Sequence, residues 1–380
     1  MRYYKIIIIF ILYLCSCPGK EIEIYDPLKD PRNITRNKGV STSPEISVDR
    51  NGNVYIAWID TERGSATLYE YELFYKERIN GEWKETEILS SEHSLLLYKK
   101  ALLVDDNGDV HIVYSEPVSD VEVRSFYRMK RNGNWSEKYD VAGGEIQVGG
   151  QASICKDDLN NIYFYDPCCF TKKVNGVWGE KVYINRGYSN PDMFVEGDGK
   201  VHIVGEIGME IEYIYSPDGG GNWEGLYLFP RAYNEYDVRP GVCAVKGKVY
   251  VAWTRTREGK IAGTYISVKD TNGVWSEPKE IIGEETKPLD VLLRTDGEYL
   301  YLMENEIIDG NCEFIIYRMD VNTGELKGVN ISNTTEEGTT SLIGSFEVKN
   351  NTIYCVWAEK YDDYEIDIFY DEIPVSVFDE

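Results

Sequence analysis

The sequence lacks the features that are typical of metal-binding, nucleic-acid-binding and helical proteins. It has only 3 His, and none of its 8 Cys shows C-x-x-C spacing or a His at ligand spacing, so we expect no metal and no cofactor. No basic run offsets the net charge of −25, which argues against nucleic acid as a partner. Helical periodicity of any length is absent, whereas 13% of the residues are aromatic, including 30 Tyr. This composition favours β-strands.

The N-terminal residues have the character of an export signal. A basic start is followed by an apolar stretch, residues 6–14, that is too short to span a bilayer comfortably. LCSC, residues 14–17, resembles a bacterial lipobox, in which the Cys is lipidated. We predict a signal peptide over 1–16, a lipid anchor on Cys17 with a short linker over 17–20, and an exported protein held at the periplasmic or cell-surface side of a bacterial membrane. Cleavage and release as a soluble protein is the alternative.

One short phrase occurs in seven copies along the rest of the chain. NVYIAW at 53–58 returns as DVHIVY, NIYFYD, KVHIVG, KVYVAW, YLYLME and TIYCVW. Each copy follows an apolar strand and a turn signal, which is the pattern of a β-hairpin. A second phrase, a Gly-containing turn before an aromatic residue, follows a third strand and ends at Trp83, Trp135, Trp178, Trp223 and Trp275, with Leu326 in that place in the sixth unit. Each unit therefore has the strands and the period of a propeller blade.

The last unit is incomplete, and the start of the chain offers the missing piece. From about Gly338 onward there is no second phrase and no fourth strand, whereas residues 21–35, with Tyr25 in the Trp place, precede the first unit as a fourth strand would. We predict a single domain over 21–380, an all-β propeller of four-stranded antiparallel blades. Seven blades are expected, with the N-terminal strand 21–35 completing the last blade. A six-bladed ring with a degenerate third unit is the alternative.

The stretch SPDGGGNW, residues 216–223, matches the pattern S-x-D-x-G-x-x-W through Ser216, Asp218, Gly220 and Trp223. The Ser and Asp side chains can cap the N–H groups of a tight turn, the Gly can adopt a positive φ, and the Trp can bury its ring between hairpins. With the repeats, this motif resembles the Asp-box (BNR) repeats of the sialidase-like propeller superfamily. In that family the box lies on the face away from the ligand, so the resemblance implies a fold rather than a chemistry.

The opposite face of such a propeller carries the loops that enter each innermost strand and those that join the second strand to the third. Polar residues at these places are Asp60, Glu62, Arg63, Lys99, Lys100, Glu116, Gln151, Asp166, Asn190, Asp192, Glu206, Arg239, Arg255, Arg257, Asp290, Glu304, Glu359 and Lys360. Arg239, Arg255 and Arg257 beside Glu206 could clamp a ligand carboxylate, and Arg63 is a further candidate. Pairing of these arginines with the many surface acids is the simpler alternative.

The resemblance also implies what a sialidase would require: an arginine triad, a Tyr nucleophile activated by a Glu, and an Asp as acid/base. The first family arginine lies in an Arg-Ile-Pro-like motif, where this chain has SPEI at 43–46. We therefore predict a monomeric glycan- or protein-binding module at the cell envelope. A sialidase-like glycoside hydrolase with Glu206, Asp60 or Glu116 as catalytic carboxylates is the alternative. A purely structural envelope component is a third possibility.

Side chains of reactive type fall within strand patterns. His111 and His202 occupy the repeat slot that Tyr fills in most other copies, so we expect packed strand residues rather than bases. Cys243 and Cys355 lie in apolar strands and are expected to be buried thiols. The disulfide pairing of the other cysteines is not specified by the sequence.

Overall fold

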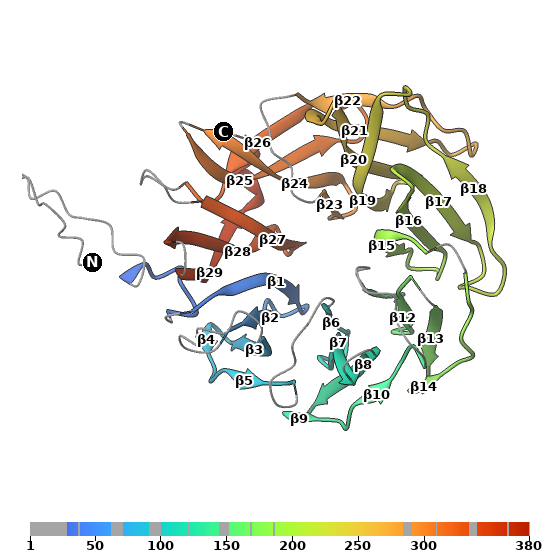
Figure 1. The fold of residues 1–380 in the computed structure, drawn as a ribbon. Coiled ribbons are helices and arrows are strands. Elements are labelled where there is room, and N and C mark those ends of the chain that lie inside the picture. The colour runs from blue at the N-terminus through green and yellow to red at the C-terminus, as the bar shows by residue number, and fades with distance from the viewer. Residues whose placement is uncertain are drawn as a thin grey trace, which may run out of the picture.

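In the computed structural model, β-sheets are arranged around a common axis in a ring (Figure 1). The structure describes residues 29–36, 39–61, 71–90, 100–119, 122–143, 152–167, 169–184, 187–283, 291–308, 310–333, 340–362 and 365–379. Antiparallel strands make up almost all of the regular structure in these ranges. Within them, no helix has the length and apolar character needed to cross a membrane.

Groups of strands that follow one another in the chain lie side by side in the ring (Figure 1). The first sheet contains β1 (Ser41–Val48), β2 (Val54–Asp60), β3 (Glu72–Ile79), β4 (Glu82–Trp83) and β5 (Glu87–Ile88). The second contains β6 (Lys100–Val104), β7 (Val110–Ser119), β8 (Glu122–Arg131), β9 (Asn134–Trp135) and β10 (Tyr139–Asp140). The third contains β11 (Ser153–Lys156), β12 (Ile162–Tyr165), β13 (Phe170–Val174) and β14 (Val177–Trp178).

The second half of the ring repeats this order. The fourth sheet contains β15 (Ser189–Val195), β16 (Val201–Ile207), β17 (Glu210–Ser216) and β18 (Glu224–Leu228), and the fifth contains β19 (Glu235–Val245), β20 (Lys248–Arg257), β21 (Lys260–Lys269) and β22 (Lys279–Ile282). The last sheet joins β23 (Leu292–Thr295), β24 (Tyr299–Ile308), β25 (Asn311–Asp320) and β26 (Leu326–Asn330) to β27 (Thr340–Lys349), β28 (Thr352–Asp362) and β29 (Glu365–Pro374). A parallel pair, Cys312 with Thr340, links the two groups. A short 3-10 helix, η2 (Val375–Asp379), follows β29.

The tryptophans of the second phrase connect neighbouring sheets. Their rings meet an aromatic ring of the preceding sheet edge-on, with centroids 5.0–5.2 Å apart: Trp135 on Tyr75, Trp178 on Tyr127, Trp223 on Phe170, Trp275 on Tyr213, and Trp83 on Tyr370. Edge-to-face geometry of this kind adds to the gain from burying the rings. The pair of Trp83 and Tyr370 joins the first sheet to β29, so the same contact also bridges the two ends of the chain.

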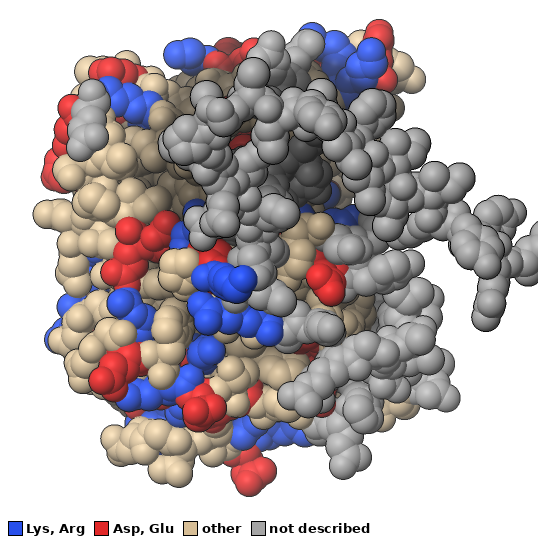
Figure 2. Space-filling view, turned by 90° about the vertical axis from the view of Figure 1, so that its left-hand side faces the viewer, with Lys and Arg blue, Asp and Glu red and all other residues tan. Residues whose placement is uncertain are grey.

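The N-terminal segment pairs with the last strand. Ile34 N–H donates to the carbonyl of Ile368 at 2.8 Å, and Tyr370 N–H donates to the carbonyl of Arg32 at 2.8 Å. Asn33 is buried, and its Nδ2 donates to Asp367 at 2.7 Å. Among the residues coloured in Figure 2, basic and acidic side chains are interspersed on this side of the ring.

Two of the reactive side chains singled out from the sequence are packed inside the sheets, as predicted. His111 and His202 are buried, and their Nδ1 atoms lie 2.7 and 2.8 Å from the hydroxyl groups of Tyr127 and Tyr213. The Nε2 of His202 lies 3.0 Å from the Glu196 carboxylate in the preceding turn. Both imidazole rings therefore have hydrogen-bond partners inside the fold, as structural side chains do.

The predicted buried thiols are also where the strand pattern places them. Cys243 and Cys355 are fully buried free cysteines, and burial raises the pKa of both thiols. Thiols of this kind are unreactive at neutral pH.

Candidate functional site

A cavity of about 660 Å³ lies on the axis of the ring. It is lined by the first strand of every group: β1, β6, β11, β15, β19, β23 and β27. The volume falls within the range of small-molecule sites, and an axial position lets side chains from all parts of the ring converge. This cavity is therefore the candidate functional site.

Backbone bulges shape one end of the cavity. Ser43, Asn190 and Arg239 line it, each has a positive φ (51°, 43° and 56°), and each is followed by a proline. The pairing register of β1, β15 and β19 shifts at these points. Left-handed backbone is costly for residues other than Gly and Asn, and such bulges occur preferentially beside functional sites.

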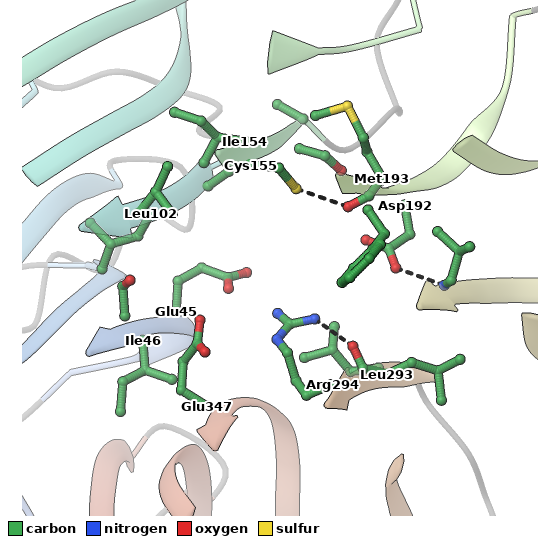
Figure 3. A pocket seen from close by; sticks show the side chains of 18 of the residues that line it. Glu45, Ile46, Leu102, Ile154, Cys155, Asp192, Met193, Leu293, Arg294 and Glu347 are labelled. Atoms are coloured by element: carbon green, nitrogen blue, oxygen red, sulfur yellow. Dashed lines mark hydrogen bonds between the residues drawn. The ribbon is translucent and has the colours of Figure 1, made fainter. Parts of the chain in front are cut away.

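The middle of the cavity carries opposite charges that do not touch. Figure 3 shows Arg294 of β23 and Glu347 of β27 pointing into it, with Glu45 and Asp192 close by. Among the described residues, no carboxylate oxygen lies within 4.0 Å of the Arg294 guanidinium, whose protein acceptor is the carbonyl of Leu293 at 2.9 Å. Glu347 accepts no hydrogen bond from any of these residues. Both side chains are half-buried, and charges held partly out of water are usually paired.

The electrostatics of these groups follow from burial and mutual attraction. Burial raises the pKa of the Glu347 and Asp192 carboxyls, and the positive charge of Arg294 opposes this rise. Burial works against the charged form of Arg294, but Glu347, Asp192 and Glu45 outweigh it and raise the pKa of the guanidinium. Arg294 therefore stays protonated. The nearby Cys155 thiol donates to the carbonyl of Met193 at 3.0 Å, and burial raises its pKa to about 12, so it is no nucleophile at neutral pH.

The structure does not bring the three predicted arginines together. Arg255 is buried and pairs with Asp237 through two hydrogen bonds of 2.7 and 2.8 Å. Arg257 pairs with Glu235 at 2.6 Å. Of the three, only Arg239 lines the axial cavity. Arg255 and Arg257 therefore pair with neighbouring acids, which is the simpler of the two alternatives raised by the sequence.

Glu206 forms hydrogen bonds to two of the bulges. Its Oε1 accepts hydrogen bonds from Asn190 Nδ2 at 2.8 Å and from the backbone N–H of Arg239 at 2.5 Å. Because Asn190 and Arg239 belong to neighbouring sheets, this carboxylate holds both bulged strands in place. The contacts assign Glu206 a positioning role at the cavity rim.

The other candidate carboxylates are held within their own sheets. Asp60 is buried and accepts hydrogen bonds from Ser41 Oγ at 2.6 Å and Trp58 Nε1 at 3.2 Å. Glu116 is buried and pairs with Lys138 at 2.5 Å. Asp60 lies on β2 and Glu116 on β7, so each is fixed by its local sheet.

Two further acids expected on the loop face, Glu304 and Glu359, are buried within β24 and β28. Burial raises the pKa of Glu304 to about 8, with Glu306 adding to the rise and Thr264 opposing it. Burial likewise raises the pKa of Glu359 to about 7, although Ser341 Oγ and Trp357 Nε1 donate to it at 2.8 Å. These groups lie within the sheets rather than in the axial cavity.

Several predicted residues lie outside the described ranges. These are Arg63, Glu62, Lys99, Gln151, Asp290, Tyr25 and the proposed anchor Cys17. The backbone of Lys100 belongs to β6. Among the residues that the structure does describe, no group of three or more His, Cys, Asp or Glu could hold a metal ion.

The turn at Ser216–Trp223 has the hydrogen bonds that its sequence suggests. Gly220 N–H donates to Ser216 Oγ at 2.7 Å, and Ser216 Oγ donates to Asp218 at 3.0 Å. Asn222 N–H donates to Asp218 at 2.8 Å, and Gly220 has a φ of 100°. The turn follows β17 at the outside of the ring and contributes no side chain to the axial cavity.

Sequence reasoning did not select Arg294 and Glu347, although the repeat contains a signal for them. In each unit, one residue of the first strand pairs with the Tyr or His slot of the second strand: Ser47, Leu103, Cys155, Phe194, Cys243, Arg294 and Glu347. Aligning the units at that slot shows that Arg294 and Glu347 are the charged members of the series. Charge at a position that is otherwise apolar or small would have marked them as functional candidates.

Comparisons with known proteins support the fold. No family model matches the sequence, and none of the curated proteins matches it. Among solved structures, a protein of unknown function from Dyadobacter fermentans has a TM-score of 0.56 and 12% identity, covering 89% of this chain and 95% of that one. The phage phi92 endosialidase has a TM-score of 0.52 and 9% identity, covering 90% and 68%. The NanB sialidase of Streptococcus pneumoniae has a TM-score of 0.50 and 12% identity, covering 91% and 70%. The chain therefore has the sialidase-like fold, that of an all-β propeller.

Proposed function

We propose that this protein is a glycan-binding module and that its ligand enters the axial cavity. The observation that carries the proposal is the pair of Arg294 and Glu347, which face the cavity without an opposite charge within 4.0 Å among the residues that the structure describes. Sugar hydroxyl groups both donate and accept hydrogen bonds, so a sugar can satisfy a guanidinium and a carboxylate at the same time. The sialidase-like fold of the endosialidase and sialidase neighbours supports this ligand class by analogy.

A binding panel with one cavity variant tests the proposal. Titration calorimetry of the purified protein against mono- and oligosaccharides should reveal binding, and Arg294→Met should weaken it at least roughly tenfold because charge-assisted hydrogen bonds are lost. Lys246→Met is the matched control, because Lys246 pairs with Glu298 on the surface. A panel without any bound sugar, or equal affinity of wild type and Arg294→Met, would contradict the proposal.

The second candidate function is that of a glycoside hydrolase, which the sialidase and endosialidase neighbours favour. Asp60, Glu116 and Glu206 remain its carboxylate candidates, although their present contacts are structural. Fluorogenic glycosides should be hydrolysed by the wild type and not by Glu206→Gln if this candidate is correct. If the protein binds glycosides without hydrolysing them, the hydrolase candidate is rejected and the binding module remains the proposed function.

We propose that the protein is held at the periplasmic or cell-surface side of a bacterial membrane, with a lipid on Cys17 as anchor. The sequence of residues 14–17 supports this location, since it resembles a lipobox. Expression of the full chain with a radiolabelled fatty acid should label the protein, and Cys17→Ala should abolish the label and release the protein from membranes. Labelling of the Cys17→Ala variant would overturn the assignment.

We also propose that the ring consists of seven blades and that the N-terminal segment completes the last one. The division of the last sheet into β23–β26 and β27–β29 supports seven units. The pairing of residues 32–34 with 368–370 and the contact of Trp83 with Tyr370 support the closure. A closed ring leaves no group of strands without a neighbour on either side.

A further inference from the structure

A second pocket, called the rim pocket below, lies outside the axial cavity. It opens between the turn before β19 and the turn that joins β20 to β21, and its lining residues are Arg231, Tyr233, Asn234, Tyr236, Glu258 and Gly259. Tyr233 and Tyr236 are 99% and 38% exposed. Met209, whose carbonyl accepts from the N–H of Asp237 at 3.1 Å, is 55% exposed beside them. Large apolar side chains that gather at one place on a surface are typical of a binding site.

A network of charged groups fixes the turn that carries these tyrosines. Arg231 Nη1 donates to the carbonyl of Glu235 at 2.6 Å, and the N–H of Ala232 donates to the carboxylate of Glu235 at 3.0 Å. Glu235 is buried and pairs with Arg257 at 2.6 Å and with Arg255 at 3.2 Å. A turn that is held in this way loses little conformational freedom when a ligand binds to it. The two arginines singled out from the sequence therefore help to hold an aromatic surface in place.

The rim pocket continues from the mouth of the axial cavity. Tyr236 and Arg239 both belong to β19, and Arg239 lines the axial cavity. The strand between them spans at most about 10 Å. Met209 follows β16, which contains Glu206, and Glu206 accepts a hydrogen bond from the N–H of Arg239. Both chain segments thus lead from the rim of the cavity to the exposed rings, so a ligand of several linked units can reach from one to the other.

The chemistry of the rim pocket suits a sugar ring. One face of such a ring carries C–H groups, which can pack on the apolar face of a tyrosine, and its edge carries hydroxyl groups. Among the described residues, none forms a hydrogen bond with the Asn234 amide or the Tyr233 hydroxyl, so both can bond to sugar hydroxyls. Aromatic side chains with a few polar groups between them are typical of small-molecule sites.

We propose that Tyr233 and Tyr236 form a subsite that stacks on a further sugar unit of an oligosaccharide whose first unit lies in the axial cavity. This inference rests on the proposed glycan-binding function and specifies its ligand as an oligosaccharide. Packing on an aromatic ring needs a C–H face rather than one pattern of hydroxyl groups. The subsite therefore selects the length of the ligand more than the type of its sugar.

The test compares monosaccharides with their linear trimers by titration calorimetry on the full-length wild-type protein. The pairs are glucose with maltotriose, N-acetylglucosamine with tri-N-acetylchitotriose, and galacturonate with trigalacturonate. In every pair that binds, we expect the trimer to bind at least roughly tenfold more tightly, because the tyrosine rings add contact area. Three units also offer more ways to place one unit in the cavity, which explains a gain of at most about threefold.

Two variants assign the gain to the rim pocket. Tyr233→Ala and Tyr236→Ala should each lower the ratio of trimer to monosaccharide affinity, and the double variant should bring it to about threefold or less. Tyr183→Ala is the matched control, because Tyr183 is also exposed, at 66%, and does not line either pocket. It should keep the wild-type ratio.

The outcomes separate the two proposals. A wild-type ratio of about threefold or less, or a ratio that the double variant leaves unchanged, overturns the rim subsite and leaves the glycan-binding function standing. Binding of none of the sugars, in these pairs or in the wider panel, overturns both. The comparison of each trimer with its monosaccharide needs no variant, so it can overturn the subsite even if a variant does not fold.

Discussion

At the scale of single residues, the most unusual groups are carboxyls that the fold holds away from water. Glu304 is fully buried, and neither of its carboxylate oxygens has a hydrogen-bond partner within 3.5 Å in the part of the chain that the structure describes. Its pKa is raised by burial from 4.5 to about 8. At neutral pH the side chain is therefore protonated in the folded protein, whereas in the unfolded chain it is ionised.

This difference predicts how stability depends on pH. Between about pH 4.5 and about pH 8 the folded state holds a proton that the unfolded state has released, so the free energy of unfolding decreases as the pH rises. Glu304→Gln keeps a neutral side chain of similar size and removes this contribution. In urea unfolding from about pH 5 to about pH 9, the variant should gain stability relative to wild type as pH rises, by at least about 1 kcal/mol.

The matched control is Glu325→Gln, which changes an exposed acid in the loop before β26. Its difference from wild type should stay nearly constant over the same pH range. A Glu304→Gln variant whose difference from wild type is also constant would show that Glu304 titrates alike in both states.

At the scale of elements, the turns fix how neighbouring sheets pack. A Cβ added to Gly220 would lie 2.0 Å from Cε1 of Phe170, the residue whose ring meets Trp223. Gly133 offers a comparison, because it also has a positive φ, 76°, but a Cβ there would meet nothing within 4 Å. The two positions therefore separate backbone strain from steric conflict.

We expect Gly133→Ala to cost about 1 kcal/mol of unfolding free energy, which is the cost of left-handed backbone for an L-residue. Gly220→Ala should cost about 2–4 kcal/mol, since Phe170 must also move. Thermal or urea unfolding of both variants measures the difference. Equal losses would mean that Phe170 adjusts without cost and that the turn does not control the packing of the sheets.

Elements are also the level at which sequence reasoning succeeds and stops. Strands such as β2 and β28 could be predicted because a short run of β-branched and aromatic residues after an Asn-containing turn is a local signal. The positions of Arg255 and Arg257 could not, since the acids that hold them, Asp237 and Glu235, are cross-strand partners whose register only the fold defines. Arg294 was not selected as a site residue for a related reason: a strand pattern does not say which side chains face the axis of the ring.

At the scale of the whole molecule, the ring depends on contacts between its two ends. Asn33 is central to them: its Nδ2 donates to Asp367, and its Oδ1 accepts from the N–H groups of Thr35 and Arg36 at 3.1 and 2.9 Å. Losing a buried amide with several hydrogen bonds leaves polar partners unsatisfied. Asn33→Ala should therefore reduce the unfolding free energy by about 2–3 kcal/mol.

Hydrogen exchange can locate that loss. In Asn33→Ala, the amides of Ile368 and Tyr370 should exchange faster than in wild type, because their partners Thr35 and Arg32 lie in the loosened segment. Asn134→Ala, which changes an exposed residue at the start of β9, should leave both rates unchanged. Unaltered protection of these two amides in Asn33→Ala would show that the segment is held by other contacts.

The pairing of residues 32–34 with β29 has a consequence for the order of the chain itself. Because residues 32–34 are hydrogen-bonded to β29, a short peptide that joins this segment to the end of β29 would close the backbone into a circle, and a cut at an exposed turn such as Asn132–Gly133 would open it again. The resulting circular permutant would place its new ends at the rim of the second sheet. It should fold into the same ring, because every sheet would keep the adjacent sheets that it has in the original chain.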